Sequence, residues 1–379
     1  MANIKNSDKS FISEHENYTF CGIPICKIKR TDNTKAKNFL NIIQKKKSFN
    51  NYTEVQAIKI FGQQIYQRIE DLDAIKINIL GISKTQNKQK AIIKQLKKLI
   101  PDDITKVFIL KSNLGEAYLF LKYIINNFIT DTDIPLIIAT KPMHLQIAKM
   151  LVPNIQRLYC NKLNYEVNQK IFNINKKTIY IAYPLKFYID VENSAGNSDI
   201  CYLNEMYRYY QISDEKKAKI NRINLSETSI KGIENYLIKN HIDKFIFISK
   251  YANTSENLSE KFWKKLESKI PIKIIYNNNK FKLEEVSYLA EKASAVISLR
   301  SGLSEILSET ANSHIVIYTN FKKRYRFNEI KKENVLKMYS IKNLGVTNNN
   351  IYELLYSDEH ENEIIENILN IIKAKEFTI

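Results

Sequence analysis

The stretch A-V-I-S-L-R-S-G-L-S-E-I-L, Ala295 to Leu307, joins an apolar run to Arg, Ser and Gly and then to a helical pattern. A short continuous apolar run such as 295–299 is typical of a strand that is buried on both faces. The following residues place Leu303, Ile306 and Leu307 at helical spacing. The stretch therefore predicts a strand, a tight turn and a helix, the repeating unit of an α/β fold.

The same alternation recurs from about residue 105 onward. Continuous apolar strands that alternate with helical segments predict parallel sheets covered by helices on both faces. The polar, Tyr-rich stretch 183–235, expected to be irregular, separates two series of such units. We therefore expect an α/β protein with two tandem Rossmann-like domains, at 101–225 and 226–379, and a closing helix at about 361–375. The expected strands are 106–111, 134–139, 177–182, 244–249, 272–276, 295–299 and 314–318.

Residues 1–100 follow a different pattern. A polar start leads to Y-T-F-C-G-I-P-I-C-K-I, which predicts a short hairpin around Gly22 and Pro24. Two lysine-rich segments follow, at 35–70 and 86–99, and their apolar residues recur at helical period. The sequence therefore predicts a basic, mainly helical N-terminal extension.

The composition limits the partners and the compartment. The 379 residues include 58 basic and 40 acidic side chains, a net charge of +18. This balance favours phosphorylated substrates, an anionic membrane surface or nucleic acid, although lysines on solvated faces would also explain it. The four cysteines form no C-x-x-C pair, which is unlike a zinc site and typical of reduced cytosolic proteins. No apolar run reaches the ~20 residues of a membrane span, so we expect a cytoplasmic protein that is soluble or attached to a membrane surface.

Two strand-to-helix turns carry the candidate site, K-S-N-L-G-E-A at 111–117 and R-S-G-L-S at 300–304. Ligands of parallel sheets bind at the carboxyl ends of strands, where both turns are expected. Gly302 and Ser304 would leave N–H groups at a helix N-terminus, and Arg300 would add a contact to a phosphate. The alternative is a capped helix N-terminus, which explains the serines but not Arg and Gly together.

These residues resemble motifs of GT-B glycosyltransferases, in particular the bacterial heptosyltransferase-like group of lipopolysaccharide and capsule synthesis. In that family a strand ends in D-[ST]-G-L-x-H-L beneath the donor pyrophosphate. Ser301, Gly302 and Leu303 match it, whereas Arg300 stands at the Asp and Glu305 at the His.

Two further family motifs have counterparts. The family loop M-G-D-x-L, which carries the proposed catalytic base, resembles N-L-G-E-A-Y-L, with Gly115 matching and Glu116 at the base position. The family's W-x-x-L helix resembles Trp263 to Leu266. A family lysine ahead of that helix falls on Glu256, with Lys250 and Lys261 close by.

The resemblance implies a metal-independent, cofactor-free transfer from a nucleotide-sugar to a glycan or lipid-linked acceptor. Glu116 would take the acceptor proton while the hydroxyl attacks the anomeric carbon with inversion; the alternative is a helix N-terminal charge without chemistry. Expected acceptor contacts are Ser112, Asn113, Gly115 and Lys141. Expected donor contacts are Arg300, Ser301, Gly302, Leu303, Ser304 and Glu305, together with Lys250, Tyr251, Asn253, Tyr276, Asn277, Tyr318 and Thr319 at other strand ends.

Other functions stay open at this point. D-T-D at 131–133 precedes a strand, whereas a metal-binding D-x-D should follow one. A nucleotide-sugar epimerase would use the same donor turn without an acceptor groove. A nucleic-acid-binding protein would suit the charge, but the basic residues are dispersed and no binding motif occurs, so we expect no nucleic-acid partner. A membrane-surface scaffold would use the basic helices.

Overall fold

The computed structural model describes residues 14–376, with gaps at 21–22, 32–33, 40–42, 50–52, 61–62, 72–73, 112, 164–169, 195–199, 215–216, 218–219, 279, 323–328 and 346–349. Its strands are β1 Glu14–Phe20, β2 Ile23–Thr31, β3 Thr34–Phe39, β4 Ile43–Phe49, β5 Glu54–Ile60, β6 Gln63–Glu70, β7 Ala74–Ile79, β8 Ile82–Asn87, β9 Lys106–Leu110, β10 Pro135–Ala139, β11 Leu158–Cys160, β12 Ile171–Ile174, β13 Lys177–Ala182, β14 Phe245–Ser249, β15 Lys273–Tyr276, β16 Ala295–Leu299, β17 His314–Tyr318 and β18 Ile351–Leu355. Its α-helices are α1 Lys88–Leu99, α2 Leu114–Leu119, α3 Pro142–Leu151, α4 Leu185–Ser194, α5 Tyr202–Tyr210, α6 Glu227–Lys239, α7 Glu260–Glu267, α8 Leu283–Lys292, α9 Gly302–Thr310, α10 Lys332–Tyr339 and α11 Glu361–Glu376.

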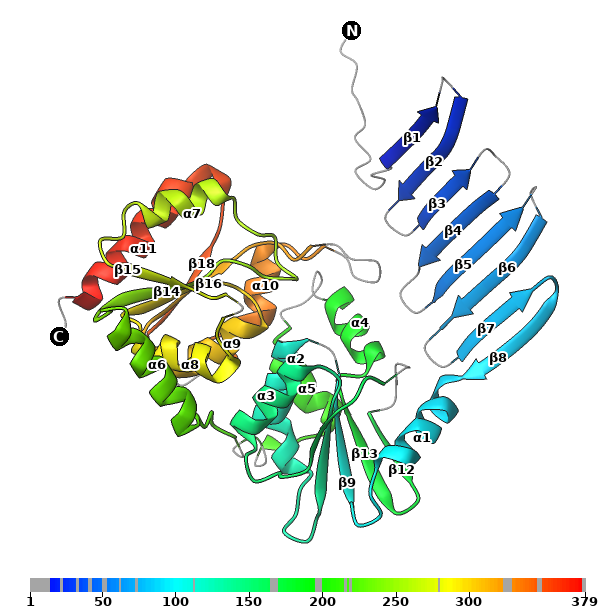
Figure 1. Cartoon of the computed structure of the whole chain (residues 1–379), viewed down its shortest axis with the longest axis horizontal. Coiled ribbons are helices and arrows are strands. Elements are labelled where there is room, and N and C mark those ends of the chain that lie inside the picture. The colour runs from blue at the N-terminus through cyan, green and yellow to red at the C-terminus, as the bar shows by residue number, and fades with distance from the viewer. Residues whose placement is uncertain are drawn as a thin grey trace.

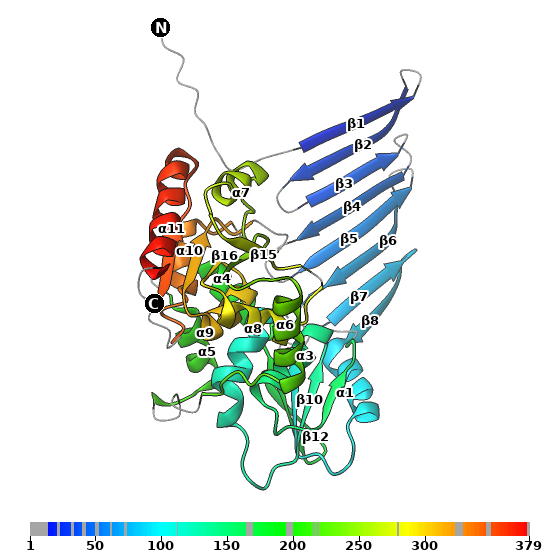
Figure 2. The same ribbon diagram turned by 60° about the vertical axis from the view of Figure 1, so that its left-hand side comes forward.

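The N-terminal extension is a β-sheet, so the prediction of a mainly helical region 1–100 is wrong. Among the described residues, β1 to β8 pair consecutively in one antiparallel sheet. Figures 1 and 2 show it as a single layer that stands beside the remainder of the chain. The predicted hairpin is confirmed by the pairing of Phe20 with Ile23, whereas the helix expected over 35–70 falls on β3 to β6.

The error has a physical reason. Lys, Gln and Ile tolerate both helix and strand, so their approximate helical spacing in 35–70 does not decide between the two. Pairing with neighbouring strands supplies backbone hydrogen bonds that no local pattern reports. One local signal does exist: Leu80 and Gly81 join β7 to β8 at φ values of 49° and 87°, as a two-residue hairpin turn of type I′ requires.

Helix α1 links the N-terminal sheet to the first α/β half, and it confirms the helix expected at 86–99. Asn87 caps it by accepting a hydrogen bond from the Lys90 N–H. Ile92 and Leu96 are fully buried against the sheet that contains β9. On the other side, buried Lys88 forms a 2.8 Å ion pair with Glu70 of β6, which ties α1 back to the N-terminal sheet.

Two further sheets confirm the predicted alternation of strands and helices. In the described chain the first has the order β11-β10-β9-β13-β12, parallel except for the edge strand β12, and the second has the all-parallel order β15-β14-β16-β17-β18. All seven expected strands are present. In each sheet the first strand of the series, β9 or β14, has neighbours on both sides, which creates a switch point where ligands bind.

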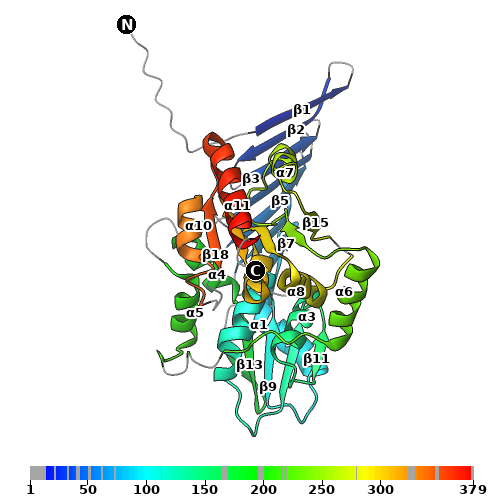
Figure 3. The same cartoon turned by 90° about the vertical axis from the view of Figure 1, so that its left-hand side faces the viewer.

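Helices cover both faces of each sheet. In the second half, α7 and α11 pack on one face, and α6, α8 and α9 lie toward the other. Figure 3 shows α11, the expected closing helix, across this half. The segment 183–235 is more regular than predicted, since it contains α4, α5 and the start of α6. The Tyr-rich stretch is α5, with Tyr202, Tyr207 and Tyr210 buried in the core. None of the helices in the described ranges combines the length and apolarity that crossing a bilayer requires.

The two α/β halves meet where α2 contacts α9. Gly115 and Gly302 face each other so closely that a Cβ on Gly302 would lie 2.3 Å from the Gly115 nitrogen. Two turns further along α9, Glu309 accepts hydrogen bonds from Tyr118 Oη and Lys122 Nζ, both at 2.8 Å. Since Lys122 and Tyr118 are buried, this polar cluster fixes how the two halves are oriented.

We expect Gly302→Ala to lower the free energy of unfolding by about 1–3 kcal/mol, because the added methyl group forces α2 and α9 apart. Gly232→Ala in α6 is the matched control: its nearest neighbour would be 4.0 Å away, and it should be neutral or stabilise by about 0.5–1 kcal/mol. Urea denaturation measures both. Equal stabilities of the two variants would contradict the role of this contact.

Candidate functional site

A cavity of about 510 Å³ lies between the two α/β halves, at the carboxyl ends of their strands. The loops that follow β9 and β10 form one wall, and those that follow β14, β15 and β16 form the other. It brings together twelve of the predicted site residues: Asn113, Gly115, Glu116, Lys141, Tyr251, Asn253, Asn277, Arg300, Ser301, Gly302, Leu303 and Glu305. The two turns singled out in the sequence thus line one cavity, because the Gly115–Gly302 contact holds them together.

Arg300 and Glu305 form a buried ion pair in the cavity wall. The Arg300 Nη2 donates to Glu305 Oε1 at 2.6 Å, and both side chains are at most 5% exposed. The other Arg300 nitrogens donate to carbonyl oxygens, Nε to Tyr339 at 2.8 Å and Nη1 to Ser301 at 2.6 Å. Arg300 is therefore chiefly the counter-charge of Glu305. Its predicted contact to a donor phosphate stays a prediction.

The structure confirms helix capping by the serines of this turn, and anion binding there stays a prediction. Ser301 is the N-cap of α9: its Oγ accepts from the Ser304 N–H, and the Ser304 Oγ accepts from the Ser301 N–H at 2.9 Å. Ser304 is fully buried and absent from the described cavity lining. The capping leaves the N–H groups of Gly302 and Leu303 at the cavity, since first-turn donors have no partner inside the helix.

Two more serines, one in β16 and one in α9, stabilise the fold. Ser298 and Ser308 hydrogen bond the two ring nitrogens of His314, at 2.8 and 2.7 Å. Burial lowers the pKa of His314 to about 3, with the Arg300 charge acting in the same direction. His314 is therefore neutral, and it fixes β16, β17 and α9 to one another.

Glu116 lies in the first turn of α2, half-buried, and its Oε1 accepts a hydrogen bond from Asn113 Nδ2 at 3.1 Å. Glu305 approaches from the other half: its Oε2 would be 2.8 Å from a Cβ placed on Gly115. Burial raises the pKa of the Glu305 carboxyl to about 7; the Arg300 charge and hydrogen bond oppose this shift, and the Glu116 charge adds to it. Two carboxyl groups therefore share the base of the cavity.

Several predicted donor contacts lie elsewhere in the described structure. Lys250 forms a 2.6 Å ion pair with Glu267 and lies over the ring of Tyr276, so both side chains are directed at α7 instead of the cavity. Tyr318 is fully buried and donates to Glu353. Ser112, an expected acceptor contact, falls outside the described residues. Lys250, Tyr276 and Tyr318 lie at strand ends as predicted, but a position at a strand end does not fix the direction of a side chain.

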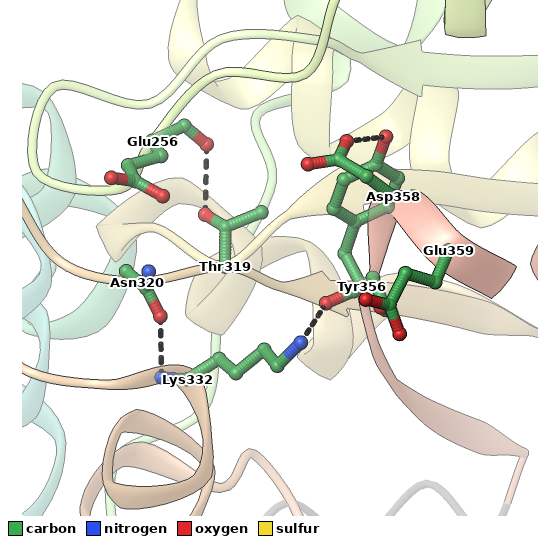
Figure 4. A pocket seen from close by; sticks show the side chains of 8 residues that line it. Glu256, Thr319, Asn320, Lys332, Tyr356, Asp358 and Glu359 are labelled. Atoms are coloured by element: carbon green, nitrogen blue, oxygen red, sulfur yellow. Dashed lines mark hydrogen bonds between the residues drawn. The ribbon is translucent and has the colours of Figure 1, made fainter. Parts of the chain in front are cut away.

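Thr319 lines a different and smaller pocket of about 270 Å³, shown in Figure 4. Its Oγ1 donates to the Glu256 carbonyl, and Asp358 and Glu359 lie across the pocket. Three carboxylates with one lysine would repel a diphosphate, so this pocket is a poor donor site. Within the described residues, no three His, Cys, Asp or Glu side chains are placed to hold a metal ion.

The cavity also contains residues that the sequence did not indicate. His144, in the first turn of α3, lies at the end of β10, and its ring hydrogen bonds the Leu110 carbonyl at 3.1 Å. Because His144 follows the predicted strand 134–139, the sequence contained enough information to include it among the candidate site residues. Tyr202 and Tyr339 come from α5 and α10, and no local motif marks them.

We expect Glu305→Gln to remove a pH dependence of stability. A carboxyl whose pKa rises from 4.5 to about 7 on folding stabilises the protein at low pH, and that contribution is lost as the pH rises toward 7. Between pH 5 and 8 the unmodified protein should lose about 2 kcal/mol relative to the variant, measured by urea denaturation. Glu227→Gln, at an 89% exposed side chain, is the control and should follow the unmodified protein. Parallel curves for Glu305→Gln would rule out the shift.

No protein-family model matches the chain, and no curated protein matches its sequence. Solved structures that it resembles include a family 9 glycosyltransferase from Veillonella parvula, with 8% identity, 73% of this chain and 99% of that chain covered, and a TM-score of 0.47. Another is the glycosyltransferase TibC from enterotoxigenic E. coli, with 11% identity, 68% and 70% coverage and a TM-score of 0.34. A third is TarM, with 13% identity, 97% and 73% coverage and a TM-score of 0.27. The chain is thus similar to solved glycosyltransferases, and at these identities the similarity concerns the fold alone.

Proposed function

We propose that the chain is a glycosyltransferase that moves a sugar from a nucleotide-sugar donor to a glycan acceptor in the cavity between its α/β halves. One observation carries this proposal: a single cavity at the carboxyl ends of two parallel sheets combines a helix N-terminus at Gly302 with the carboxyl group of Glu116. The first is suited to bind a diphosphate, and the second is suited to accept a proton.

The donor diphosphate would bind at the start of α9. The N–H groups of Gly302 and Leu303 and the helix dipole favour an anion there. The buried Glu305 would oppose it, but Arg300 and a pKa near neutrality reduce that negative charge. Exposed Lys141, on the opposite wall, adds a positive charge at the cavity mouth.

The transfer would proceed without a metal and with inversion. Glu116 takes the proton of the acceptor hydroxyl, and the oxygen forms a bond to the anomeric carbon of the donor sugar. The bond from that carbon to the phosphate oxygen breaks, and the nucleoside diphosphate leaves with the electron pair. The hydrogen bond from Asn113 orients the Glu116 carboxyl for this step.

We expect at least one of UDP, GDP, CDP, ADP and CMP to raise the thermal midpoint of unfolding, because a ligand that binds only the folded state stabilises it. Glu116→Gln should keep this shift and lose turnover by about 100-fold or more, measured as nucleotide release from the matching nucleotide-sugar. Glu256→Gln, in the smaller pocket, is the control and should keep both properties.

Two outcomes would count against the proposal. If no nucleotide stabilises the protein, the cavity is not a donor site. If Glu116→Gln retains full turnover, Glu116 is not the base. Release of an epimerised nucleotide-sugar without transfer would instead identify an epimerase on the same fold.

A further inference from the structure

The N-terminal sheet has a cavity of its own, far along the chain from the candidate active site. It measures about 430 Å³ and lies on one face of β4, β5 and β6. Its lining residues are Gln44, Lys46, Ser48, Val55, Ala57, Lys59, Gln64 and Gln67. Amide, hydroxyl and ammonium groups therefore surround a short apolar floor.

The strand register extends this face beyond the cavity. Lys46 lies opposite Ala57, which lies opposite Gln67, and Gln67 lies opposite Asn78. Residues that are directly opposite each other in an antiparallel sheet share a face. Val55, which lines the cavity, lies opposite Ile69, so Ile69 is also on this face. Ile69 lies opposite Lys76, and Lys76 lies opposite Thr85, which places both on the same face. We call it the lysine face, defined by Lys46, Lys59 and Lys76 and by the cavity between the first two.

The two faces of β4 to β8 differ in their charged side chains. The acidic side chains of these strands, Glu54 and Glu70, lie opposite each other on the other face. There Glu54 pairs with Lys47 at 3.0 Å, and Glu70 pairs with Arg68 and Lys88. Lys46, Lys59 and Lys76 are exposed, and the described part of their face carries no carboxylate. The lysine face therefore carries positive charge only, whereas the opposite face carries both signs, with Lys45, Lys47, Arg68 and Lys84 beside the two carboxylates.

The chemistry of the lysine face selects a class of ligand. Lys46 and Lys59 are diagonal neighbours on adjacent strands, a spacing of about 7–8 Å that suits charges repeated along a polymer. Gln44, Gln64, Gln67 and Ser48 can hydrogen bond sugar hydroxyls. Over β4 to β8 the register places no described aromatic side chain on this face, so it lacks the platforms on which nucleic-acid bases stack.

We propose that the lysine face binds an extended anionic glycan and thereby holds the acceptor polymer of the enzyme. The identification of that glycan as the acceptor rests on the proposed function. Binding on the N-terminal sheet would raise the local concentration of acceptor ends near the cavity without contributing to the chemistry there.

The test uses the full chain and dextran sulfate as the probe, at low salt. Lys46→Gln/Lys59→Gln should weaken binding about tenfold, because exposed charges on one face act together. The matched control is Lys45→Gln/Lys84→Gln, which removes two exposed lysines from the opposite face of the same sheet and should change binding less than twofold. Neutral dextran should not bind, and single-stranded DNA of equal charge should bind more weakly than dextran sulfate.

Three results would overturn the proposal. They are equal losses in both double variants, no binding of dextran sulfate, and DNA binding at least as tight as that of dextran sulfate. The nucleotide-induced thermal shift reports on the cavity between the α/β halves and not on the lysine face. It should be the same in both double variants. Dextran sulfate binding without any nucleotide shift would support the lysine face and reject the glycosyltransferase, and the converse result would do the opposite.

Discussion

The contact between Gly115 and Gly302 determines the geometry of the site. A methyl group on either residue would come within 2.7 Å of the backbone of the other, so only glycine on both sides allows α2 and α9 to approach this closely. Each glycine belongs to a turn that follows a strand of a parallel series, the first strand β9 in one half and the third strand β16 in the other. Their contact therefore places two carboxyl strand ends from different sheets around one cavity. The cluster of Tyr118, Lys122 and Glu309 then limits rotation about this contact.

The same closeness explains why Arg stands at position 300. The approach of α2 brings Glu116 near Glu305, and two carboxylates in a buried site repel each other. An arginine beside Glu305 supplies a counter-charge and two further hydrogen bonds to carbonyl oxygens, which satisfy a guanidinium that has lost its water. In the heptosyltransferase-like motif these positions hold Asp and His. The two positions at which the chain differs from the motif it resembles are thus joined in one ion pair.

The sequence predicted those helices and strands whose residue pattern is contained in a single segment. Continuous apolar runs such as 295–299 and 314–318 reveal buried parallel strands, and Asn87 with the amphipathic pattern after it reveals α1. The N-terminal sheet was not predicted, because strand pairing depends on contacts between different segments. In addition, the pattern of these lysine-rich strands resembles that of amphipathic helices. At the site, the glycines and Glu116 were found from their place after strands. Lys250 and Tyr318 occupy equivalent places but turn toward Glu267 and Glu353, since the charge and packing of neighbouring elements decide side-chain direction.

The structure also shows where the charges that make up the net charge of +18 are located, which the composition does not. In the cavity between the α/β halves Arg300 is paired with Glu305, so the positive charge available there is small. In the N-terminal sheet the acidic residues pair on one face and leave Lys46, Lys59 and Lys76 on the other. The described sheet thus carries three exposed lysines on a face without carboxylates, whereas the arginine of the cavity is paired. This separation suits the proposed division of roles, in which the sheet would hold a polymer while the cavity would bind only its reacting end.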